Sequence, residues 1–70
     1  MNARTLMEKL EPFKGEEWID VVDEINRIAL AHSYTINVID PDAPGNLDQD
    51  FSRLNVRINK QFVVTSFTIG

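Results

Sequence analysis

The residues best equipped for chemistry lie in the stretch 40–51, DPDAPGNLDQDF, where carboxylates surround a single leucine. Carboxylates at this spacing suggest calcium, because positions 1, 3, 6, 8 and 9 of an EF-hand-like loop would be Asp40, Asp42, Gly45, Leu47 and Asp48. The pattern fails at position 5, which is Pro44, and at position 12, which is Phe51 where a bidentate glutamate is needed. The flanking sequences also favour strands over helices, so calcium binding is the less favoured alternative.

Catalysis is not indicated by the residue types present. The chain has no cysteine nucleophile and a single histidine, His32, and it lacks both a glycine-rich phosphate loop and zinc-ligand spacing. The other carboxylates follow the polar side of a predicted helix, where none is paired for acid–base work. We therefore expect a protein that is not an enzyme and needs no cofactor or metal.

The stretch 40–51 is long for a connection within a compact domain. Loops of about 12 or more residues are uncommon and are usually functional or disordered. Pro41 and Pro44 each fix φ and favour extended geometry in the residue before them. We interpret residues 42–50 as a partly stiffened, extended loop that presents Leu47 near its middle.

Length and composition limit what can hold this loop in place. The chain has 70 residues, no cysteine and a formal net charge of −4. One domain of this size buries only about 60% of its unfolded surface, so one apolar core must supply its stability. The seven Lys and Arg residues are scattered, which argues against nucleic acid, and no apolar run is long enough for a membrane span. Because residues 1–10 lack signal-peptide features, we expect a cytosolic protein unless a leader has been removed.

Hydrophobic periodicity predicts one long helix, from about Glu16 to His32. Its apolar face follows the i, i+3, i+4, i+7 pattern and comprises Trp18, Val21, Val22, Ile25, Ile28, Ala29 and His32. Residues 1–12 are expected to be an N-terminal extension, either a short helix closed by Pro12 or a disordered segment. Residues 13–70 are expected to form a single domain.

Strands are predicted at 34–39, from 52 to 58 and at 62–69, with a short turn at 59–61. The middle strand alternates cleanly, so that Leu54, Val56 and Ile58 face the helix. The predicted fold class is therefore α+β: one helix packed on a small mixed β-sheet, with the long loop between the first two strands.

The other side of the middle strand carries Arg53, Asn55 and Arg57. A chain returning from the loop into Arg53 could place that guanidinium beneath the loop, where it would donate to loop carbonyls and to Asp48. Charge-assisted bonds of this kind are about twice as strong as neutral ones. An ordinary solvated strand face is the alternative interpretation of this polar row.

In its predicted loop and in the polar row of the middle strand, the sequence resembles the potato type I serine-protease inhibitor family, the eglin-like chymotrypsin and subtilisin inhibitors. The order of helix, strand, loop, arginine-led strand and terminal glycine is similar over residues 13–70, roughly four-fifths of the chain. The segment FSRLNV, residues 51–56, is similar to bacterial and fungal members of such inhibitors.

The resemblance implies a reactive-site loop, with Leu47 entering the specificity pocket of the protease and Leu47–Asp48 as the scissile bond. That loop would comprise Pro44, Gly45, Asn46, Leu47, Asp48, Gln49 and Asp50. Its implied support is Arg53, Asn55, Arg57 and Gly70. The sequence departs from the family pattern where Asn46 replaces a threonine, Asn55 replaces the second supporting arginine, and Pro44–Gly45 replace β-branched residues.

The partner implied is a chymotrypsin-like or subtilisin-like serine protease, because leucine suits a deep apolar pocket. The protein is expected to bind it as a monomer. Trypsin, whose pocket carries an aspartate, is expected to be a poor target. The alternative that the departures leave open is an inhibitor-like scaffold that binds a protein other than a protease.

Overall fold

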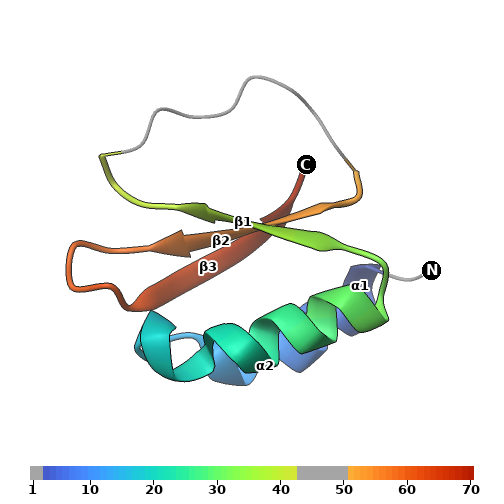
Figure 1. The fold of residues 1–70 in the computed structure, drawn as a ribbon, viewed down its shortest axis with the longest axis horizontal. Helices are drawn as coiled ribbons and strands as arrows, with labels where there is room; N and C mark the ends of the chain where they lie inside the picture. Colours follow the sequence, from blue (N-terminus) through green and yellow to red (C-terminus); the bar gives the residue numbers. More distant parts are fainter. Residues whose placement is uncertain (1–2, 43–50) are drawn as a thin grey trace.

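The computed structural model describes residues 3–42 and 51–70. The elements, in chain order, are α1 (Ala3–Leu10), the 3-10 turn η1 (Glu11–Phe13), α2 (Trp18–Ala31), β1 (Thr35–Ile39), β2 (Arg53–Ile58) and β3 (Val64–Ile69). Both helices lie on the same side of a small sheet (Figure 1). The structure thus confirms the predicted α+β class with a mixed sheet. Within the described residues, neither helix is long and apolar enough to cross a membrane.

The sheet has three strands in the order β1-β2-β3. β1 pairs with β2 in parallel, with Thr35 opposite Arg53 and Ile39 opposite Arg57. β2 pairs with β3 in antiparallel fashion, and the register shifts between Arg57 and Ile58. The arginine-led strand is therefore the central strand, hydrogen-bonded on both sides.

Helix α2 forms where the 3.6-residue apolar period runs, and it buries Val21, Ile25 and Ala29. Its C-terminus is closed by a Schellman motif, in which the Tyr34 N–H donates to the Ala29 carbonyl at 2.8 Å and the Ser33 N–H donates to the Leu30 carbonyl at 3.0 Å. Ser33 occupies the left-handed position of this motif with φ 64°, a position usually taken by glycine.

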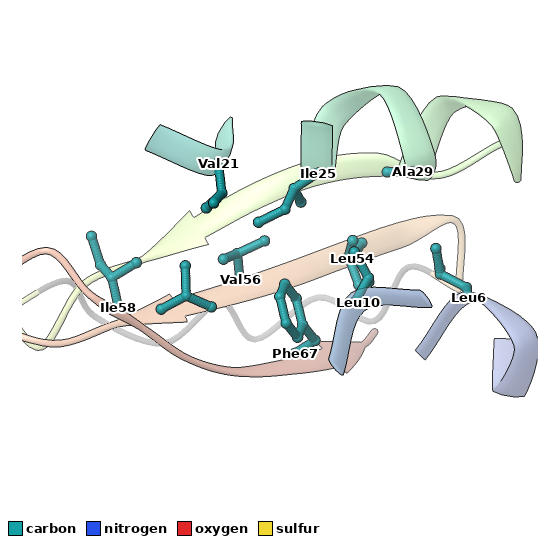
Figure 2. Packing of buried hydrophobic residues seen from close by; sticks show 10 residues of the cluster. Leu6, Leu10, Val21, Ile25, Ala29, Leu54, Val56, Ile58 and Phe67 are labelled. Atoms are coloured by element: carbon teal, nitrogen blue, oxygen red, sulfur yellow. The ribbon is translucent and has the colours of Figure 1, made fainter. Parts of the chain in front are cut away.

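The core lies between the two helices and the sheet (Figure 2). As predicted, Leu54, Val56 and Ile58 of β2 are buried against the apolar stripe of α2. β3 contributes Val64 and Phe67 to the same cluster. Trp18 packs against this cluster while remaining half-buried.

Residues 3–10 form a helix, one of the two alternatives expected for the N-terminal extension. Leu6 and Leu10 of α1 are both fully buried and belong to the same core as the sheet (Figure 2). The helix stops before Pro12, which lies in η1, as the sequence indicated. The described part of the extension thus packs as an integral layer of the fold.

Most element boundaries lie within one residue of the sequence-based expectation, and the two largest differences are at the starts of α2 and β3. The helix was expected to begin at about Glu16 but begins at Trp18, because residues 15–18 pair with residues 62–64 at the start of β3. The Gly15 N–H donates to the Val64 carbonyl at 2.8 Å, and the Val64 N–H donates to the Glu16 carbonyl at 2.9 Å. The last strand begins at Val64 instead of Phe62, because the turn after β2 extends to Val63.

Candidate functional site

The segment between β1 and β2, residues 40–52, must travel back along the sheet, because the two strands it joins are parallel. Such a connection needs a dozen or more residues and is usually helical. The parallel pairing of β1 and β2 therefore explains why the connection between them is long. The residues predicted to be the reactive-site loop, and with them the bond Leu47–Asp48, lie outside the described residues: Pro44, Gly45, Asn46, Leu47, Asp48, Gln49 and Asp50.

Both stems of this segment are described, and they lie at opposite ends of the sheet (Figure 1). At the first stem, beyond the end of β1, the Asp42 N–H donates to Asp40 Oδ1 at 2.8 Å, a local turn typical of aspartate. At the second stem, the Thr35 N–H donates to the Ser52 carbonyl at 2.9 Å, which ties the start of β1 to the approach of β2. The second stem is therefore hydrogen-bonded to the sheet, whereas the bond at the first stem is a local turn just beyond β1.

The sheet side opposite the core carries mostly polar side chains. Strand alternation and the register place on it Thr35, Asn37, Arg53, Asn55, Arg57, Ser66 and Thr68. We call these residues the polar face. Ile39, opposite Arg57, is an apolar exception at one end. Neither helix covers this side (Figure 1).

Asn55 is the centre of the polar face, and only 9% of its surface is exposed. Its Oδ1 accepts a hydrogen bond from Asn37 Nδ2 at 3.2 Å. Its Nδ2 donates to the Gly70 carbonyl at 2.8 Å. The side chain thus joins β1, β2 and the end of β3. The alternative interpretation, an ordinary solvated strand face, is therefore wrong at Asn55.

Gly70 is held at this position through both its N–H and its carbonyl. Its N–H donates to the Arg53 carbonyl at 3.2 Å, in addition to the bond that its carbonyl accepts from Asn55. Its φ of 133° lies in the region that favours glycine. Asn55 and Gly70, both predicted as loop support, therefore act together as a brace within the sheet.

The two arginines of the polar face lie near different stems. Arg53 follows Ser52 directly and is half-buried, opposite Thr35 at the start of β1. Arg57 is exposed and lies opposite Ile39, at the end where β1 leads into Asp40. Four residues along a strand span about 13 Å, so the arginines reach different parts of the polar face. Arg57 is thus well separated from Arg53, with Asn55 between them.

Asn37 was missed by the sequence-based reasoning, although it makes the bond that links β1 to Asn55. The signal was present in principle, because Asn37 is the one amide in an otherwise apolar and β-branched strand segment. Its partner could not be named without the register, which the sequence did not provide.

The acidic stretch is not flanked as an EF-hand requires. The elements on either side are β1 and β2, as expected, whereas an EF-hand loop joins two helices. Among the described residues, no group of three or more His, Asp or Glu side chains could hold a metal ion. What the described residues offer is a second stem hydrogen-bonded to the start of β1, next to a hydrogen-bonded polar face.

A scan of protein-family models found no match to the chain, and a search of the curated proteins found no significant match. Any assignment of function therefore depends on the residues and their geometry.

Proposed function

We propose that the protein inhibits serine endopeptidases of the chymotrypsin or subtilisin type. The segment around Leu47–Asp48 would bind in the substrate cleft of the protease in the manner of a substrate and resist release of its products. This proposal assigns no catalytic role to the chain and requires no cofactor.

The observation that carries the proposal is the way in which the segment 40–52 is anchored. It joins two parallel, directly paired strands, and its second stem runs into Arg53, whose carbonyl accepts a hydrogen bond from the Gly70 N–H of the brace. A segment of this kind has both ends held by one sheet. That is the requirement for a loop that stays in place after one of its peptide bonds is cut.

The mechanism follows from the chemistry of the protease. The catalytic serine attacks the carbonyl before the scissile bond, and the amine that leaves must diffuse away before water completes hydrolysis. If Asp48 is part of a chain held at Ser52 and Arg53, its new amine remains near the acyl-enzyme and can re-form the bond. The enzyme therefore stays occupied.

Anchoring also favours association. Each rotamer-rich side chain that is ordered on binding costs about 0.5–1.5 kcal/mol, and a pre-ordered segment avoids part of this cost. Protease–inhibitor complexes of ordinary interface size are among the tightest known. Leu47 would supply the apolar group for the specificity pocket, which favours chymotrypsin-like and subtilisin-like enzymes over trypsin.

The test is a titration of chymotrypsin, subtilisin and trypsin with the protein, followed by residual peptidase activity and by mass spectrometry of the protein. We expect inhibition of the first two enzymes in the nanomolar to micromolar range, with slow cleavage confined to Leu47–Asp48. Leu47→Asp should abolish most of the inhibition, because it places a charge in an apolar pocket.

Full activity of a broad panel of such proteases in the presence of excess protein would reject the proposal. The alternative is then an inhibitor-like scaffold that binds a different protein. Rapid digestion within residues 43–50, without a phase of inhibition, would indicate a substrate and would equally reject it.

A further inference from the structure

The turn between β2 and β3 holds an exposed aromatic side chain in an unfavourable backbone conformation. Phe62 has φ 61°, in the left-handed region, and 64% of its surface is exposed. The Asn59 side chain fixes the turn, because its Oδ1 accepts from the Gln61 N–H at 2.9 Å and from the Val63 N–H at 3.0 Å. The Phe62 N–H in turn donates to the Asn59 carbonyl at 3.0 Å.

Glycine is the residue that such a position favours in a three-residue hairpin loop. A phenylalanine here carries the strain of the left-handed conformation, and its exposed ring recovers little of that strain by burial within the chain. Backbone strain of this kind clusters at functional positions, where a contact with a partner can offset it. Phe62 is therefore a candidate contact residue.

A pocket adjoins the ring. It has a volume of about 280 Å³ and is lined by Asp40, Pro41, Asp42, Asn59, Lys60 and Phe62. This volume lies just below the usual range for small-molecule sites, so it suits one inserted side chain better than a whole ligand. The pocket joins the β2–β3 turn to the first stem of the segment 40–52, and these two features share one end of the sheet (Figure 1).

The charges of the pocket favour a cation. Asp40 and Asp42 are both exposed, and within the described part of the chain neither carboxylate forms an ion pair. Lys60 is the single positive charge in the lining, and the chain as a whole carries a net charge of −4. An arginine fits best, because its planar guanidinium can stack on the Phe62 ring and bind a carboxylate in a bidentate manner.

We propose that the pocket formed by Phe62, Pro41, Asp40 and Asp42 is a second contact site, which receives an arginine side chain from the surface of the bound protease. The identity of the partner rests on the proposed function, and the preference for an arginine side chain rests on the pocket alone. Asp42, which lines the pocket, directly precedes residues 43–50 in the sequence, so a protease bound to that segment would be close to the pocket along the chain.

The preference for arginine can be tested without any protease. Nitrogen-15 spectra of the protein are recorded during titration with N-acetyl-arginine-amide, and separately with N-acetyl-norleucine-amide as an uncharged control. We expect millimolar binding of the arginine probe, with amide shifts confined to residues 40–42 and 59–63, and no such shifts with the control. Asp42→Asn should weaken this binding, and Lys60→Gln should strengthen it, each by about two- to fivefold.

Phe62→Gly separates a binding role from a structural one. It relieves the left-handed strain, so Tm should rise by roughly 5 °C. The same variant should lose the arginine-probe shifts and should weaken inhibition of a sensitive protease by about two- to fivefold. Asparagine tolerates the left-handed conformation but has no ring. Phe62→Asn should therefore lose binding of the arginine probe to the same extent as Phe62→Gly.

Three outcomes would overturn the inference. The first is an absence of localised shifts with the arginine probe, and the second is equal shifts with norleucine. The third is a Phe62→Gly variant that gains stability while inhibition is unchanged. Failure of the proposed function is distinguishable from all three, because it would leave every protease active while the probe still binds.

Discussion

The side-chain amide of Asn55 donates a hydrogen bond of 2.8 Å to the carbonyl oxygen of Gly70, the last residue of the sequence. Through the same side chain, Asn55 also accepts from Asn37 on the other neighbouring strand. An amide suits this position because it can accept on one side and donate on the other, which an arginine cannot do. The amide at residue 55 thus has a local structural use.

Asn55→Ala should lower the free energy of unfolding by about 1–3 kcal/mol, because it leaves the Asn37 amide and the Gly70 carbonyl without this partner. Asn37→Ala removes only one of the two bonds and should cost less. Urea denaturation of both variants measures the difference. A larger loss in Asn37→Ala than in Asn55→Ala would contradict the central role of Asn55.

Arg53→Gln should make the protein a better substrate, because the arginine next to the second stem would no longer offer a charged donor toward the loop. We expect cleavage at Leu47–Asp48 to accelerate about tenfold or more, the equivalent of one charge-assisted hydrogen bond. Arg57→Gln is the matched control, since Arg57 lies at the opposite end of the polar face. Cleavage is followed by mass spectrometry with excess protease, and equal acceleration in both variants would count against the assignment to Arg53.

Leu47→Gln should weaken inhibition by roughly 10- to 150-fold, corresponding to about 1.5–3 kcal/mol for burying one leucine side chain. Leu30→Gln is the matched control, because Leu30 lies on the outer side of α2 and is 58% exposed. Inhibition constants for both variants are measured against the most sensitive protease. If the two variants behave alike, Leu47 is not the specificity residue.

Leu10→Ala should destabilise the fold by about 2–5 kcal/mol, because it opens a cavity at a fully buried position of α1. Glu8→Ala, on the exposed side of the same helix, should change stability by less than about 0.5 kcal/mol. Chemical denaturation would reveal the difference. Near-equal stability of the two variants would mean that α1 is a dispensable extension.

Ser33→Gly should stabilise the protein by about 1 kcal/mol, since glycine adopts the left-handed position of the Schellman motif without a clash at Cβ. Ser33→Ala should stay at or below the stability of the parent. Thermal unfolding distinguishes the two, and a destabilised Ser33→Gly variant would show that the serine side chain contributes more than its conformation costs.

The fold could be predicted where one residue pattern determines one element. The apolar period of α2 and the alternation of β2 both indicate the side that is buried, and the structure buries Ile25 and Leu54 accordingly. Boundaries were less predictable, because Glu16 reads as the first turn of a helix but pairs with Val64, far along the chain. Long-range pairing of this kind leaves no local signal.

The candidate site was predictable only in part. The sequence identified the polar row of β2, and strand alternation correctly placed Asn55 on it. The link from Asn37 to Asn55 depends on the parallel register, and the conformation of Phe62 depends on the bonds that Asn59 makes in the turn. Neither follows from the preference of the residue concerned, since the register links two distant strands and phenylalanine disfavours the conformation that it adopts.

The segment 40–52, which connects the parallel strands β1 and β2, has a consequence for how this small fold could diversify. Its described residues, Asp40, Pro41, Asp42, Phe51 and Ser52, are all exposed, and none of them belongs to the core. Doubling the length of a flexible connection adds only about 0.6 kcal/mol of closure entropy. The frame of helices and sheet could therefore accept new lengths and compositions between its first two strands, so that recognition can evolve without rebuilding the scaffold.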